Sequence, residues 1–218
     1  MNRRDFSAQL AIGFGVAGIG LAASGTSRAQ GGFVEGTHYA RLVQPVLVTA
    51  PAGKVEVIEF FWYGCPHCNA FEPALDAWQK KLPADVAFKR VPVAFRAIYA
   101  VHQQIFYALE ALDKVEVMHR KVFYAIHHDR ARLEKPEEIA DFMEKNGIDK
   151  AKFLEVFDSF SVQTKIRQAN KLAEGYKIDG VPALGVQGRY FTSGSMAGSP
   201  DRALAVADFL IDRTRKGA

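Results

Sequence analysis

Hydrophobic and polar residues recur along the chain with two different periods, and the order of these periods predicts an α/β fold. A run rich in β-branched and aromatic residues, Lys54–Phe61, is typical of a buried strand, and Val86–Val93 is expected to form the next one. Between them, apolar residues from Phe71 to Leu82 recur at the spacing of a helix. A strand, a helix and a second strand in this order predict a β-α-β unit.

A long helical region follows this unit. From Ile98 to about Tyr176 the apolar residues recur at helical spacing, with breaks at Asp113, at Lys135-Pro136 and at Asn146-Gly147. We therefore expect an inserted α-helical subdomain over residues 97–176. It would divide a sheet domain into two parts, residues 34–96 and residues 177–218.

Further elements of the sheet domain are expected on both sides of the insertion. Thr37–Val43 is predicted to form an outer strand, and another strand begins near Val181. A hairpin turn is expected at Gln187–Tyr190. An amphipathic helix over Asp201–Arg213, capped near Ser199, closes the chain.

The first 29 residues have the features of an export signal and are not expected to belong to the fold. Arg3 and Arg4 form a positively charged start, an apolar stretch rich in Gly and Ala follows, and small residues surround Arg28. The alternative is a membrane anchor, but the apolar stretch is short for a span of about 20 residues. The start also resembles a twin-arginine signal, so the sequence leaves the Sec and twin-arginine routes open.

The only two cysteines of the chain, Cys65 and Cys68, stand where the first long strand ends and the first helix begins. Gly64 breaks the strand, and Pro66 suits the first helical position because its missing N–H is not needed there. Unpaired N–H groups and the helix dipole stabilise an anion at Cys65, and His67 adds a donor or a positive charge. A stabilised Cys65 thiolate would make the Cys65–Cys68 disulfide oxidising.

Other roles of the cysteine pair fit the sequence less well. A disulfide that closes so short a loop restrains the unfolded chain little compared with a long-range bridge. A structural zinc site needs four ligands, and the distant histidines do not supply the missing ones at regular spacing. Adjacent His127 and His128 are expected to form a solvated helix end. We therefore expect no metal and no cofactor beyond the cysteine pair itself.

Three segments together make the chain resemble the DsbA family of periplasmic thiol:disulfide interchange proteins. The segments are Phe60-Phe61, Cys65-Pro66-His67-Cys68 and Gly180-Val181-Pro182-Ala183. The resemblance extends from about Tyr39 to the C-terminal helix, and it implies a thioredoxin-like fold with an inserted α-helical subdomain. It also implies a cis Val181–Pro182 bond that faces the cysteines and leaves the Val181 backbone free to bind an extended substrate segment.

Glu59 is the candidate acid near the cysteines. It shares one face of the predicted central strand with Val57 and Phe61, so burial there would raise its pKa. It could then relay a proton to Cys68 as that thiol leaves, and it matches an acid of the DsbA family at the same distance before the cysteines. The alternative is an exposed side chain at a sheet edge. Glu56, on the other face, is expected to be solvated.

The charge distribution excludes one class of partner. The chain has a formal net charge of +4, and its lysines and arginines are scattered among acidic residues without forming a basic stripe. Nucleic-acid-binding proteins concentrate positive charge on one face or along one element. We therefore expect no nucleic-acid partner.

These features predict a monomeric, periplasmic dithiol oxidase that acts on unfolded or folding exported polypeptides with free thiols. The resemblance further implies reoxidation by a quinone-linked membrane protein of the DsbB kind. A disulfide isomerase or a reductase is the nearest alternative, although few residues precede the fold where an isomerase carries its dimerisation domain. A redox-inactive peptide-binding or chaperone-like module and a metal carrier are two further alternatives.

Overall fold

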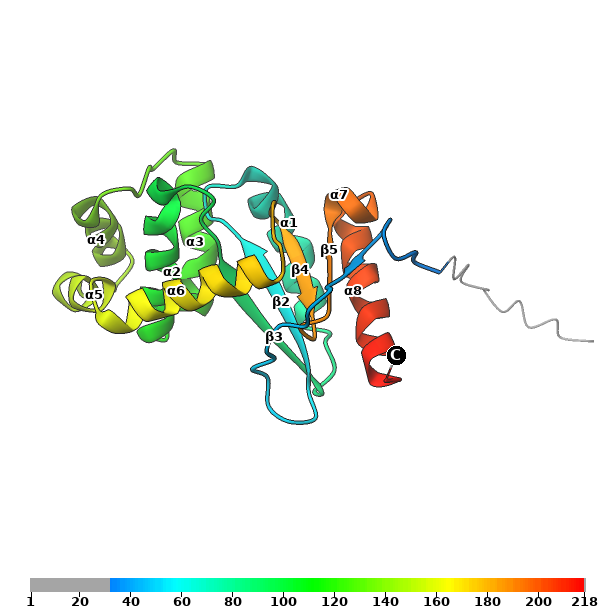
Figure 1. The fold of residues 1–218 in the computed structure, drawn as a ribbon. Helices are drawn as coiled ribbons and strands as arrows, with labels where there is room; N and C mark the ends of the chain where they lie inside the picture. The colour runs from blue at the N-terminus through cyan, green and yellow to red at the C-terminus, as the bar shows by residue number, and fades with distance from the viewer. Residues whose placement is uncertain (1–31, 218) are drawn as a thin grey trace, which may run out of the picture. The chain divides into compact units, whose positions relative to one another are not determined.

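In the described part of the chain, a mixed sheet of five strands in the order β1-β5-β4-β2-β3 forms the centre of the fold (Figure 1). β2 (Val55–Phe61) pairs in parallel with β3 (Val86–Pro92) and antiparallel with β4 (Ala183–Val186). β5 (Tyr190–Ser193) pairs with β4, and β1 (Ala40–Arg41) lies at the edge. The computed structural model describes residues 32–217, so the predicted export signal lies outside the described residues.

β2 is the central strand that the sequence predicted, and all seven of its residues are buried. A strand that is covered on both faces carries apolar residues in succession, as this one does. α1 (Pro66–Gln79) follows β2 and precedes β3, which confirms the β-α-β unit. The predicted outer strand Thr37–Val43 is wrong in extent, since only the two residues of β1 pair with β5.

The stretch between β3 and β4, which is described throughout, confirms the helical insertion. After a 3₁₀ turn (Ala97–Tyr99) it contains α2 (Ala100–Ala111), α3 (Val115–His127), α4 (Pro136–Lys145), α5 (Lys150–Phe157) and α6 (Phe160–Gly175). Three breaks between helices lie where expected, at Asp113 with a φ of 54°, before Pro136, and at Gly147 with a φ of 83°. The break between α5 and α6, at Asp158 and Ser159, was not predicted. The boundaries drawn for the two subdomains stay a prediction.

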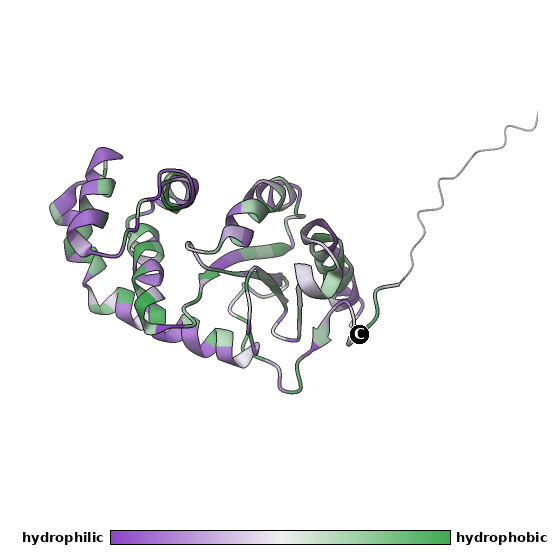
Figure 2. Cartoon of the chain, turned by 90° about the horizontal axis from the view of Figure 1, so that it is seen from above, coloured by the Kyte–Doolittle hydropathy of each residue, from purple (hydrophilic) through white to green (hydrophobic). Residues whose placement is uncertain are grey.

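Two layers of helices cover the two faces of the sheet. Figure 1 shows the insertion on one side of the sheet and α8 (Pro200–Arg215) on the other. Phe60 of β2 belongs to the core shared with the insertion, whereas Val57 packs in the core that contains Leu210 of α8. The central strands are coloured as hydrophobic in Figure 2, and the helices carry both kinds of residue. No helix among the described residues is long and apolar enough to span a bilayer.

The C-terminal part contains one element that the sequence did not predict. α7 (Gly194–Ala197) is a single short turn between β5 and α8. The predicted cap of α8 is confirmed, because the Ser199 side chain accepts a hydrogen bond from the Arg202 N–H at 3.1 Å.

Candidate active site

Cys65 occupies the N-cap position of α1, at the end of the loop that leaves β2. Pro66 is the first helical residue, and Cys65 has extended backbone angles, with φ −86° and ψ 116°. Gly64 makes this loop possible, because a Cβ there would lie 2.3 Å from the Trp62 ring. Both cysteines are free thiols in this structure, and Cys65 Sγ accepts a hydrogen bond from the Cys68 N–H at 3.4 Å.

The surroundings of Cys65 lower the pKa of its thiol from 9.0 to about 6. The hydrogen bond from the Cys68 thiol makes the largest contribution, and burial opposes it. The backbone N–H groups of Cys68 and His67, and the charge of the exposed His67 ring, lower the pKa further. At pH 7 the Cys65 sulfur is therefore mostly thiolate, which is the reactive form.

Cys68, in contrast, is a much weaker acid than an ordinary thiol. It has no exposed surface, and burial, followed by the nearby Cys65 sulfur, raises the pKa of its thiol far above the ordinary range. Cys65 at the N-cap and Cys68 in the first turn of α1 thus differ in chemistry, because Cys65 is stable as an anion and Cys68 is not. A proton must reach Cys68 whenever its bond to Cys65 is broken.

We expect Cys68→Ala to raise the Cys65 pKa more than His67→Ala does. The Cys68 side chain supplies the largest contribution to the low pKa, whereas His67→Ala removes a ring and keeps the backbone N–H. Titration of the thiolate absorbance should show a rise of about one pH unit for Cys68→Ala and a smaller one for His67→Ala. His128→Ala, which removes an exposed histidine at the end of α3, is the control. A larger rise in His67→Ala would contradict this ranking.

Val181 and Pro182 lie opposite the cysteines, just before β4. Their peptide bond is cis, as the resemblance implied, and the Val181 carbonyl oxygen lies 3.5 Å from Cys65 Sγ. A pocket of about 640 Å³ is lined by both residues and by His67. This backbone edge and the pocket thus lie beside Cys65.

Glu59 lies on β2 with no exposed surface, so the alternative of an exposed side chain at a sheet edge is wrong. Burial, followed by the charge of Glu72, raises its pKa well above the ordinary value, and Arg90 opposes this rise only in part. Arg90 Nε lies 3.0 Å from Glu59 Oε2, and Arg90 is the only ion-pair partner of this carboxyl among the described residues. The carboxyl therefore favours its protonated form.

The sequence reasoning gave no role beside Glu59 to four residues of this region. Glu72 and Arg90 interact with Glu59 directly, His119 contacts Glu72, and Tyr63 contacts His119. Glu72 could have been identified from the sequence, because it lies one turn after Cys68 on the apolar side of α1, where a carboxyl is unusual. His119 belongs to α3, and no pattern in the sequence links it to α1. Only the packing of α3 against α1 brings these groups together.

Glu56 corrects a further prediction. It was expected to be solvated, but it is only 1% exposed. Lys89 Nζ lies 2.8 Å from Glu56 Oε2, and the Thr49 hydroxyl donates a hydrogen bond to the same oxygen at 2.8 Å. The segment that contains Thr49 approaches from outside the strand, so the alternation within β2 could not reveal this contact.

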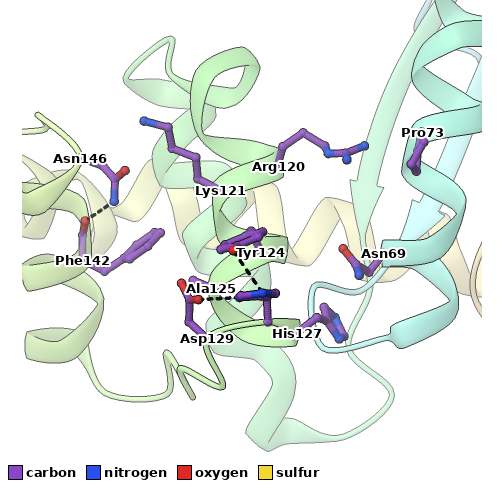
Figure 3. A pocket seen from close by; sticks show the side chains of 11 residues that line it. Asn69, Pro73, Arg120, Lys121, Tyr124, Ala125, His127, Asp129, Phe142 and Asn146 are labelled. Atoms are coloured by element: carbon purple, nitrogen blue, oxygen red, sulfur yellow. Dashed lines mark hydrogen bonds and ion pairs between the residues drawn. The ribbon is translucent and has the colours of Figure 1, made fainter.

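A second pocket, of about 870 Å³, lies next to the start of α1 (Figure 3). Asn69 lines it from α1, and Tyr124 and His127 line it from α3. The prediction of a solvated helix end is correct for His128, which is exposed and stacks on Tyr124. It is wrong for His127, because His127 Nε2 donates a hydrogen bond to the Tyr63 carbonyl oxygen at 2.8 Å. His127 thus contacts the loop that positions Cys65.

The described residues contain no cluster of three or more His, Cys, Asp or Glu side chains arranged to hold a metal ion. The buried acids are instead occupied by contacts with Arg90, Lys89 and His119.

Comparisons with known proteins agree with this geometry. The family model of the DSBA-like thioredoxin domain matches residues 56–201. The thiol:disulfide interchange protein DsbA of Pseudomonas aeruginosa is 45% identical over 186 residues, which cover 85% of this chain and 88% of that protein. The protein of the same name from Azotobacter vinelandii is 44% identical over 210 residues, covering 95% of this chain and 98% of that protein.

Solved structures lead to the same family. A crystal structure of Pseudomonas aeruginosa DsbA matches with a TM-score of 0.82 at 45% identity, and the match covers 85% of this chain and 96% of that chain. The structure of reduced DsbA1 from Neisseria meningitidis matches with a TM-score of 0.75 at 28% identity, over 86% and 97% of the two chains. The chain belongs to the DsbA-like family of thiol:disulfide oxidoreductases with a thioredoxin fold.

Proposed function

We propose that the protein donates its Cys65–Cys68 disulfide to folding polypeptides. A substrate thiolate attacks Cys65 Sγ, the Cys65–Cys68 bond breaks, and Cys68 leaves with the electron pair and takes up a proton. A second substrate thiolate then attacks the substrate sulfur of the mixed disulfide, and Cys65 leaves as a thiolate. The substrate loses two electrons and gains a disulfide, and the cysteine pair is left reduced.

The low pKa of Cys65 is the observation that carries this direction of transfer. Stabilising the thiolate stabilises the reduced protein, so each pH unit by which the pKa falls makes the disulfide about 30 mV more oxidising. A fall from 9.0 to about 6 contributes up to roughly 90 mV. This figure is an upper limit, since water at the open end of the helix screens the anion.

Glu59 is the proton donor for Cys68 in this scheme. Cys68 leaves the disulfide as a buried thiolate with a strongly raised pKa, so it takes up a proton at once. Glu59 carries a proton because of its own raised pKa, and its charge is felt at Cys68. Arg90 cannot take this role, because a guanidinium does not release its proton at neutral pH.

The loop that contains the cis Val181–Pro182 bond supplies the substrate site. An extended substrate segment pairs with the Val181 backbone beside Pro182, which presents its sulfur to Cys65. The sheet domain, residues 34–96 and 177–218, carries the cysteines and this loop, and the helical subdomain, residues 97–176, supplies the groups that pack under α1.

Membership of the family supports a proposal for the cellular setting. The substrates are exported polypeptides with free thiols in the periplasm, and residues 1–29 direct export by the Sec or the twin-arginine route. The protein acts as a monomer without an added cofactor. A DsbB-like, quinone-linked membrane protein restores the disulfide. Zinc or copper retained by the purified reduced protein in stoichiometric amount would instead indicate a metal carrier.

The redox equilibrium with glutathione tests the direction of transfer. We expect a reduction potential well above the roughly −230 to −200 mV of glutaredoxins, because the thiolate is stabilised. A value near the −270 mV or so of thioredoxin would identify a reductase. Cys65→Ser is the matched variant, since it keeps the peptide site and removes the redox centre. Full biological activity of Cys65→Ser would indicate a redox-inactive chaperone-like module.

A further inference from the structure

A line of buried polar groups runs under α1 and takes no direct part in the sulfur chemistry. The Tyr63 hydroxyl lies 2.9 Å from His119 Nδ1, and His119 Nε2 lies 3.2 Å from Glu72 Oε1. Tyr63 and Glu72 have no exposed surface, and His119 is 4% exposed. Hydrogen bonds this deeply buried are costly to leave unmade, so their pattern constrains the protonation of each member.

The positions of the protons in these hydrogen bonds follow from the residues at the two ends, Tyr63 and Glu72. Burial raises the Tyr63 pKa, so its hydroxyl remains a donor and His119 Nδ1 accepts from it. His119 Nε2 then carries the hydrogen of a neutral ring and donates it to Glu72. Burial lowers the His119 pKa in spite of the neighbouring Glu72, which agrees with a neutral ring. The His119 tautomer is thus set by its two partners.

Glu72 and Glu59 share Arg90 but are not equivalent. Arg90 Nη2 lies 3.5 Å from Glu72 Oε2, and Arg90 Nε lies 3.0 Å from Glu59 Oε2. Glu72 also accepts the hydrogen bond from His119, whereas Arg90 is the only donor beside Glu59 among the described residues. Two buried carboxyls beside one guanidinium cannot both ionise at low cost, and the one with more hydrogen-bond donors takes the negative charge.

We propose that His119 is a positioning residue that places the negative charge on Glu72 and thereby leaves the proton on Glu59. The inference rests on the proposed function in one respect, because it identifies what keeps the acid for Cys68 in its protonated form. His119 acts through Glu72, and it touches neither the cysteines nor a substrate in this scheme.

The other charged and titratable groups around the pair are few among the described residues, and each bears on its titration. Arg90 comes from β3, Asp76 from α1 and Arg120 from α3. Asp76 lies 2.9 Å from Arg90 Nη2 and 3.6 Å from Arg120 Nη1. Its carboxylate therefore offsets part of the positive charge that Arg90 presents to the two buried glutamates. Cys68 is the remaining titratable neighbour, and its charge interacts with that of Glu59. His119 is therefore the neutral donor that distinguishes the two carboxyls.

The test is an infrared titration of the buried carboxyl groups in the full chain from pH 5 to 10. The band of the protonated Glu59 carboxyl is identified by its loss in Glu59→Gln. In His119→Phe we expect the midpoint of this band to fall by about one pH unit, since Glu72 loses a donor and the pair shares its proton more evenly. Phenylalanine suits the site, because the rings of Phe61 and Phe123 lie 5.1 Å from that of His119.

Three further variants separate this role from simple packing. His119→Gln retains an amide donor for Glu72, so the midpoint should return toward that of the unchanged protein. Tyr63→Phe removes the group that sets the His119 tautomer, so it should lower the midpoint by a smaller amount and serves if His119→Phe does not fold. Val122→Ala, a fully buried change on the same helix, should leave the midpoint unchanged. An unchanged midpoint in both His119→Phe and Tyr63→Phe, or an equal fall in Val122→Ala, would overturn the proposal.

The rate of exchange with glutathione, measured over the same pH range, distinguishes this inference from the proposed function. If the carboxyl midpoint and the pH dependence of the rate shift together, both are supported. If the midpoint shifts and the pH dependence of the rate does not, His119 does place the charge, but Glu59 is not the proton donor for Cys68.

Discussion

In chemical denaturation at pH 8, the reduced protein is expected to unfold at a higher denaturant concentration than the oxidised protein. Only the reduced protein contains the Cys65 thiolate, whose pKa falls from 9.0 in an ordinary setting to about 6 in the fold. A thiol with a lowered pKa in the folded state adds stability that is complete above its unfolded pKa and is lost as the pH falls through its folded pKa. The advantage of the reduced form should therefore grow from about pH 6 to about pH 9.

The slope of this advantage separates the thiolate from other effects of the disulfide. It can reach about 1.4 kcal/mol per pH unit, and we expect roughly half of this because solvent screens the Cys65 anion. The disulfide also restrains the unfolded chain, but it closes a short loop and this contribution does not depend on pH. The variant with Cys65→Ser and Cys68→Ser should unfold alike with and without reductant. A more stable oxidised form at pH 8 would contradict the oxidase assignment.

Arg90→Met is expected to destabilise the protein by about 3 kcal/mol at pH 7. Arg90 lies 3.5 Å from Glu72 and 2.9 Å from Asp76, and its removal leaves the buried Glu72 charge without its guanidinium partner. In the unchanged protein the Glu72 pKa is lowered, since the hydrogen bond from His119 and the charges around it outweigh burial. Without Arg90 that pKa rises, so the penalty should be full at neutral pH and should fade as the pH falls through the raised pKa of Glu72.

A second substitution tests whether the Glu72 charge causes the loss of stability in Arg90→Met. Glu72→Gln in the Arg90→Met background removes the uncompensated charge, so equilibrium unfolding at pH 7 should recover most of the lost stability. Arg120→Met is the matched control, because its arginine is 51% exposed and lies 3.6 Å from Asp76. We expect that change to cost less than about 1 kcal/mol. An equal loss in both single variants would show that burial of the charge is not the cause.

Much of the fold was predictable because it depends on neighbours in the sequence. The β-branched run of β2, the helical spacing of the insertion and the break at Gly147 are local signals, and the structure confirms each of them. The extent of β1 was not predictable, because it depends on how far β5 runs beside it.

The candidate site, like the fold, was only partly predictable from the sequence. The N-cap position of Cys65 follows from Gly64 and Pro66 beside it, and the burial of Glu59 follows from the apolar strand around it. The burial of Glu56 and the contact of His127 with the active-site loop did not follow, because their partners come from distant segments. A period along one element shows which face a residue occupies, but not what covers that face.

The acidity of Cys65 could be inferred from ten neighbouring residues, because a helix N-terminus and the adjacent donors are properties of a continuous segment. Which of Glu59 and Glu72 carries the proton could not be inferred from the sequence. It depends on Glu72, Arg90 and His119, which come from α1, β3 and α3 and meet only when these elements pack. Buried charges interact over a few ångströms regardless of their separation in the chain, so this part of the chemistry belongs to the tertiary structure.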